Sequence, residues 1–137
     1  MTWEELNEVL DLKKEMKDAE KSLELLRLSA TVKVPMLDGM PKAQTTDSRV
    51  EILTIRIVDL AKEIEELKLR IIDAMRRLKN RLTIEIKDTT ARTLFILKYV
   101  DGMLMRDIGF ALGYSEAHIY YLHRITLENL IKNNSKS

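Results

Sequence analysis

Apolar residues recur every three or four positions through the first part of the chain. Over residues 3–29 they form a seven-residue repeat, which is typical of a long amphipathic helix. The repeat comprises Val9, Leu12, Met16, Ala19, Leu23, Leu26 and Ala30. Thr2 and Glu5 have the spacing of a capping box at the start of this helix, and Met1 and Leu6 stand where a hydrophobic staple would be.

A second and more regular repeat follows, with β-branched residues at most a positions and leucine at most d positions. It comprises Val50, Leu53, Ile57, Leu60, Ile64, Leu67, Ile71, Ala74 and Leu78. This pattern favours a coiled-coil-like helix over residues 48–80, and Ser48 and Glu51 fit a second capping box at its start. Between the two helices, Pro35, Pro41 and the Asp38-Gly39 pair predict a connection over residues 30–47.

The apolar stripe of the second helix is wider than a simple two-stranded coiled coil needs. Its e positions are mostly small or apolar, and Val58 and Ile72 widen it further. We therefore predict that the two helices fold into a long antiparallel hairpin and that a second copy of the chain covers the remaining seam. A hairpin that is complete within one chain is the alternative. The predicted oligomerisation residues are Val50, Leu53, Ile57, Leu60, Ile64, Leu67 and Ile71.

The segment "RLTIEIKD", residues 81–88, alternates like a strand, but a lone strand has no partner in an otherwise helical chain. We interpret it as the end of the second helix or as a link to the next one. Asp88 is a suitable N-cap for a helix over residues 89–100, which Asp101-Gly102 would end.

Residues 105–124 meet the steric requirements of a helix-turn-helix motif. Ile108 and Gly109 supply an apolar residue and a small one where the two helices cross closely. Gly113 supplies a residue that tolerates positive φ in the turn, and Ile119 would point back to the core. Leu112 and Leu122 would fill the other inward positions, and Ser115 would cap the second helix.

The predicted architecture is therefore all-α, with two domains. Residues 1–80 would form the helical hairpin that oligomerises, and residues 81–137 would form the helix-turn-helix domain. Few glycines and prolines and a high charged fraction agree with this fold class, because many short strands would need more turn residues.

Composition excludes several classes of function. The chain has no cysteine, and its two histidines, His118 and His123, lie five positions apart without a carboxylate cluster, so we expect no metal site. By default, both histidines would be polar surface residues. No phosphate-binding glycine loop, nucleophile elbow or catalytic carboxylate pair is present, so we expect neither an enzyme nor a cofactor.

Neither a signal peptide nor a membrane-spanning apolar run is apparent, and we expect a cytoplasmic protein that does not bind membranes. The formal net charge is only +1, which does not by itself indicate a nucleic-acid-binding protein.

The stretch "TARTLFILKYVDGMLMRDIGFALGYSEAHIYYLHRITLENL" resembles the C-terminal DNA-binding region (region 4) of sigma-70-type factors, and more closely phage-encoded regulators of the ArpU/RinA type. The landmarks are "LKYVDG", "IGFALGYS" and "IYYLHRITLENL". The resemblance implies transcriptional control in a bacterial host cell, with promoter DNA and host RNA polymerase as partners. The chain also differs from these relatives at four positions. Leu104 stands where they carry a capping Ser or Thr. Ala117, Tyr121 and Ile125 stand where they tend to carry arginine.

Double-stranded DNA is thus the expected ligand of a homodimer. The predicted DNA-binding residues are Ser115, Glu116, Ala117, His118, Tyr120, Tyr121, Arg124 and Arg106. Arg106 would contact phosphate, and Lys98 is a second candidate for that role. Two alternatives remain open: a DNA-packaging protein like the small terminase subunits of phages, and a helix-turn-helix adaptor that binds protein instead of DNA.

Overall fold

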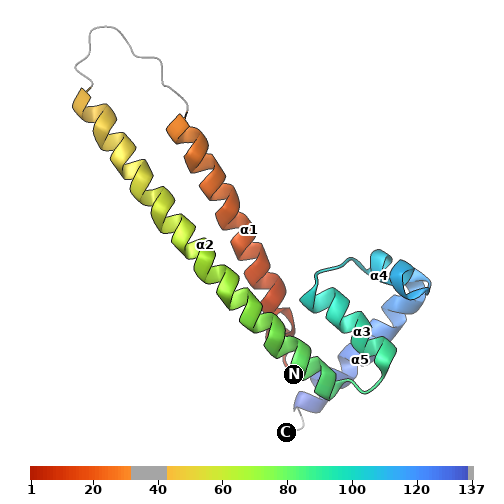
Figure 1. Ribbon diagram of the computed structural model, residues 1–137. Coiled ribbons are helices and arrows are strands. Elements are labelled where there is room, and N and C mark those ends of the chain that lie inside the picture. Colours follow the sequence, from red (N-terminus) through yellow and green to blue (C-terminus); the bar gives the residue numbers. More distant parts are fainter. Residues whose placement is uncertain (32–42, 136–137) are drawn as a thin grey trace. The chain divides into compact units, whose positions relative to one another are not determined.

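The computed structural model describes residues 1–31 and 43–135, without the side chains of 43–47 and 133–135. Within these ranges every regular element is a helix, which confirms the all-α part of the prediction (Figure 1). The elements are α1 (Trp3–Thr31), α2 (Ala43–Glu85), α3 (Thr89–Phe95), the π-helical turn η1 (Ile96–Val100), α4 (Met105–Leu112) and α5 (Glu116–Ser135). In the described part of the chain, no helix is long and apolar enough to cross a membrane.

The start of α1 has the predicted capping box. The amide of Thr2 donates to Glu5 Oε2, and the amide of Glu5 donates to Thr2 Oγ1, each over 3.2 Å. Met1 and Leu6, the two staple positions, are both buried. These contacts satisfy amides that the first turn of a helix leaves without a partner.

The predicted start of the second helix is wrong. Helix α2 begins at Ala43, so Ser48 lies inside it and does not act as an N-cap. The predicted connection over residues 30–47 is correspondingly shorter, and residues 32–42, including both prolines, lie outside the described residues.

Residues 81–85 belong to the end of α2, as the first of the two interpretations of residues 81–88 predicted. The helix continues to Glu85, and the amide of Ile86 still donates to the carbonyl oxygen of Leu82 over 2.9 Å. Leu82 and Ile86 are buried one turn apart on the same face. Asp88 then caps α3 as predicted, with its carboxylate accepting from the amide of Ala91 over 2.9 Å.

The chain divides into two compact units, which are described separately. One comprises Lys14–Leu69 and the other comprises Met1–Lys13 with Arg70–Ser137. The predicted division of domains between residues 80 and 81 stays a prediction.

In the Lys14–Leu69 unit, parts of α1 and α2 lie against each other. Leu23 of α1 and Ile64 and Leu67 of α2 are buried, and both helices line two shallow grooves. Large apolar side chains nevertheless remain exposed along both helices: Leu25, Leu28, Val50, Ile52, Ile55, Val58 and Leu69. Two helices alone offer too few faces to cover so broad an apolar stripe.

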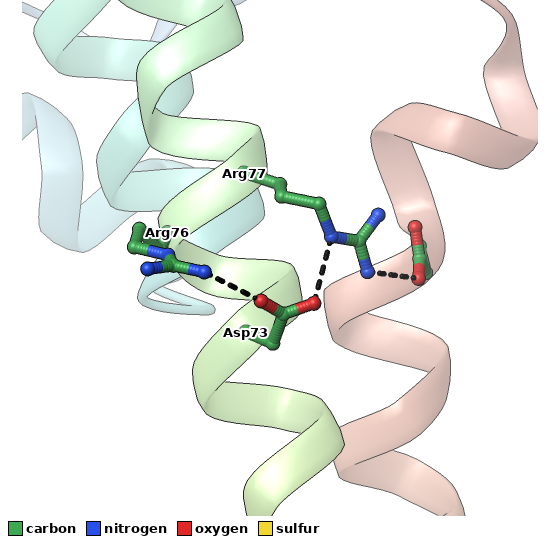
Figure 2. A network of polar contacts seen from close by, with 4 residues as sticks. Asp73, Arg76 and Arg77 are labelled. Atoms are coloured by element: carbon green, nitrogen blue, oxygen red, sulfur yellow. Dashed lines mark hydrogen bonds and ion pairs between the residues drawn. The ribbon is translucent and has the colours of Figure 1, made fainter.

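In the other unit, ion pairs join the first turns of α1 to the last turns of α2. Arg77 binds Glu8 at 3.1 Å and Asp73 at 3.0 Å, and Arg76 binds the second oxygen of Asp73 at 2.8 Å (Figure 2). The hydrogen bond from Arg77 lowers the pKa of Asp73 most, and the hydrogen bond from Arg76 lowers it further. All four side chains are well exposed, so we assign the network to alignment of the helices rather than to stability.

The same unit holds the core around α3, η1, α4 and α5. Its fully buried side chains include Leu82, Leu94, Phe95, Tyr99, Ile108 and Ile119. The N-terminal residues take part in this unit: Trp3 contacts the Tyr99 ring edge to face, and Lys13 Nζ donates to the carbonyl oxygen of Val100 over 2.7 Å. Because that carbonyl ends η1, the lysine charge also complements the helix dipole there.

His123 is not the surface residue that the sequence predicted. Its ring stacks on those of Phe95 and Tyr99, and its Nε2 lies 2.5 Å from the Tyr99 hydroxyl oxygen. Burial and the positive charge of Lys98 lower the pKa of His123, and burial raises the pKa of Tyr99 to about 12. The packed core therefore favours the neutral forms of both groups.

Acid should destabilise this core through His123. Because its pKa in the folded chain lies below its ordinary value of 6.5, its contribution is complete above pH 6.5 and is lost as the pH falls through the lowered pKa. In urea titrations at pH 7.5 and pH 5.5, the wild type should therefore lose more stability than His123→Gln. His118→Gln, at an exposed site, should behave like the wild type. An equal loss in wild type and His123→Gln would contradict this role of His123.

Candidate nucleic-acid interface

The turn between α4 and α5 is built around one glycine. Gly113 ends α4 with a φ of 78°, a left-handed conformation that glycine adopts without a Cβ clash. The amide of Tyr114 donates to the carbonyl oxygen of Gly109 over 2.9 Å, and this hydrogen bond closes the turn. The left-handed residue expected at position 113 is thus confirmed.

A second glycine lets the two segments approach closely. A Cβ on Gly109 would lie 2.9 Å from the carbonyl oxygen of Tyr114 and 3.4 Å from Cγ1 of Ile119. The first contact is with backbone, which cannot rotate away as a flexible side chain can. Ile108 and Ile119 are completely buried beside this contact, as the sequence predicted.

The starts of the two helices also agree with the sequence. Ser115 Oγ accepts from the amide of His118 over 3.2 Å, so Ser115 caps α5. Leu104 precedes α4 and makes no side-chain capping hydrogen bond. The predicted inward residues Leu112 and Leu122 are partly buried.

The eight predicted DNA-binding side chains are all exposed. Arg106 lies on α4, Ser115 lies in the turn, and the others lie on the first half of α5. Those on α5 are Glu116, Ala117, His118, Tyr120, Tyr121 and Arg124. The outer side of α5 is therefore accessible, while Ile119 holds the inner side against the core.

Tyr114 in the turn and three exposed side chains of α5 form a ladder, in the order Tyr114, His118, Tyr121 and Arg124. The ring centroids of Tyr114 and His118 are 4.9 Å apart, and those of His118 and Tyr121 are 6.4 Å apart. The guanidinium of Arg124 lies over the Tyr121 ring, 5.7 Å from its centroid. Such cation–π packing holds the guanidinium in one orientation without using its hydrogen-bond donors.

Two features of this surface were not predicted. Tyr114 joins the ladder, and Phe110 is 91% exposed on α4. The exposure of Phe110 could have been predicted from the helical period. Residues 105, 108 and 109 are buried, and position 110 therefore lies on the opposite side of α4. Lys98, the second phosphate candidate, is partly buried, and its Nζ lies 5.5 Å from the centroid of the Tyr99 ring.

The predicted oligomerisation residues fall into two groups. Ile64, Leu67 and Ile71 are already buried in the single chain. The four nearer the start of α2 are partly or fully exposed: Val50, Leu53, Ile57 and Leu60. Of the predicted residues, only this second group is available to another molecule, and the neighbouring Ile52, Ile55 and Val58 are exposed as well.

Comparison with known families gives one match. The model of a family described as a protein of unknown function (DUF1492) matches residues 28–131, which include α2, α3, η1, α4 and most of α5. No curated protein and no solved structure matches the chain.

Proposed function

The chain belongs to the DUF1492 family, and from the geometry of its C-terminal helices we propose that it is a sequence-specific, double-stranded-DNA-binding regulator of transcription. The observation that carries this proposal is the α4–α5 crossing. Gly109 and Gly113 permit a close turn, Ile119 fixes the inner side of α5, and the outer side stays free. A helix-turn-helix protein needs this combination to place its second helix in the major groove.

The polar side chains of α5 supply the contacts that such a reader needs. Ser115, His118 and Tyr120 are exposed hydrogen-bonding groups, and Arg124 is held on the Tyr121 ring. Arg106 at the start of α4 is an exposed cation for a phosphate. With so few cations, one copy would bind weakly and with strong dependence on salt.

A dimer would supply the affinity that one reader lacks. We propose that α1 and α2 form an antiparallel hairpin, because Glu5 pairs with Arg81 and Glu8 with Arg77, in opposite order along the two helices. The exposed apolar residues at the start of α2 would then pack against a second copy of the chain. Linking two readers raises the effective concentration of the second to about millimolar.

The sequence resemblance to ArpU/RinA-type phage regulators and to sigma-70 region 4 supports the promoter as the place of action. We therefore propose that the protein works with host RNA polymerase in the bacterial cytoplasm. We propose no catalytic activity for it.

Binding to duplex DNA tests the proposal directly. The full chain should bind fluorescent duplexes from a random pool at about 50 mM salt and release most of them at about 200 mM salt, because released counterions dominate the affinity. Failure to bind any duplex at the lower salt would refute the proposal.

Arg124→Ala should lower the affinity for DNA about tenfold, since a charge-assisted hydrogen bond contributes about 1.5 kcal/mol. The exposed Arg70→Ala on α2 is a matched control that should leave the affinity unchanged. Anisotropy titrations measure both, and circular dichroism verifies that each variant is folded. Equal affinities for Arg124→Ala and wild type would remove Arg124 from the interface.

The adaptor that binds protein is the second candidate function. It is favoured by the 91% exposure of Phe110, because exposed aromatic residues are enriched in protein interfaces and are not needed for phosphate contacts. Phe110→Ser should leave DNA affinity unchanged if the protein is a DNA reader. Absence of DNA binding in the wild type would favour the adaptor.

A further inference from the structure

Before Arg124, the exposed face of α5 lacks the side chains that most commonly recognise a purine. From Ser115 to His123 the sequence reads "SEAHIYYLH", without Arg, Lys, Asn or Gln. Arg and Lys pair with guanine O6 and N7, and Asn and Gln pair with adenine N6 and N7. The first two turns of α5 must therefore obtain any sequence specificity from other groups on the base edges.

The first turn of α5 offers two such contacts. Ala117 is exposed and presents only a methyl group, which matches the C5-methyl group of thymine in the major groove. Glu116 is exposed next to it and, as a carboxylate, only accepts hydrogen bonds. Among the pyrimidines it can therefore accept from cytosine N4, whereas it repels the acceptor-only edge of guanine.

The aromatic ladder extends the same preference along the helix. The rings of His118 and Tyr121 lie parallel within 30° and are exposed on α5. The faces of such rings can cover a thymine methyl group with apolar surface. Arg124 is held over the Tyr121 ring one turn further along, where it suits a phosphate contact.

We propose that α5 reads pyrimidines: Ala117 and the ladder recognise thymine methyl groups, and Glu116 recognises a cytosine amino group. The target half-site would then be rich in thymine and cytosine on the contacted strand. This inference rests on the proposed function and specifies which bases the same surface selects.

Removing the thymine methyl group alone tests the inference. Binding sites are first selected from a random duplex pool with the full chain, and the selected duplex is then synthesised with deoxyuridine in place of thymidine. Each contacted methyl group that is lost should weaken binding about fourfold, since burying one such group contributes about 0.8 kcal/mol.

Substitutions at positions 117 and 116 test which residue recognises which base. Ala117→Ser replaces the methyl contact with a hydroxyl group, so it should bring the affinities for the thymidine and deoxyuridine duplexes closer together. Ala111→Ser, at an exposed site on α4, should leave their ratio at the wild-type value. Glu116→Gln keeps the shape of the side chain but adds donors, so it should bind a duplex with adenine in place of the selected cytosine more tightly than the wild type does.

The possible outcomes separate the inference from the function on which it rests. Selected duplexes that bind equally well with thymidine and deoxyuridine would overturn methyl recognition while leaving the DNA-binding function intact. Failure to select any duplex would overturn both.

Discussion

The double substitution Ile55→Asp with Val58→Asp should convert the protein into a monomer and lower its affinity for duplex DNA about a hundredfold. Both side chains are apolar and lie on one side of α2, with exposed fractions of 60% and 47%. In the proposed dimer they are covered by the second copy, where an unpaired carboxylate would be strongly unfavourable. In the single chain, aspartate at these exposed positions should leave the fold intact.

Light scattering gives the mass of each variant, and anisotropy gives its affinity for DNA. Asn80→Asp with Thr83→Asp is the matched control, because it adds the same charge at the same spacing to exposed positions of the same helix. The control should stay dimeric. A folded dimer with aspartate at 55 and 58, or a monomeric wild type, would contradict the proposed interface. A ring of many subunits would favour the packaging protein instead.

Gly109→Ala should destabilise the unit that contains the C-terminal helices by about 3 kcal/mol, the upper end of the range for overpacking. The added Cβ would lie 2.9 Å from the carbonyl oxygen of Tyr114, so the turn and the start of α5 would have to move. The same movement should lower DNA affinity more than the loss of stability explains, because it reorients the exposed face of α5.

Gly113→Ala is the control for this effect. Its Cβ would meet nothing within 4 Å, and only the left-handed conformation would oppose it, at a cost of about 1 kcal/mol. Urea unfolding of both variants measures the difference. If Gly109→Ala were no more destabilised than Gly113→Ala, the close crossing would not matter to the stability of this unit.

The α4–α5 turn could be predicted from the sequence because its requirements are local and strict. A Cβ at position 109 would clash with backbone, position 113 has a left-handed φ that favours glycine, and Ser115 caps the helix that begins immediately after it. The start of α2 could not be predicted with the same accuracy. Ser48 and Glu51 fit a capping box by spacing alone, yet the helix begins at Ala43.

Contacts between distant parts of the chain left no local signal. His123 is partly buried because Phe95 and Tyr99 pack on its ring from helices earlier in the chain. Lys13 reaches the carbonyl oxygen of Val100, which is 87 positions away. The heptad pattern of α2 had a related ambiguity: it marks apolar positions such as Leu53 and Ile64 equally, although only Ile64 is buried within the chain.

Amide hydrogen exchange of the full chain with and without the selected duplex tests the central claim most directly. If α5 lies in the major groove, DNA should slow exchange most strongly in residues 115–124. Protection confined to α1, α2 or the segment around Phe110, with none in residues 115–124, would contradict the claim that α5 reads DNA.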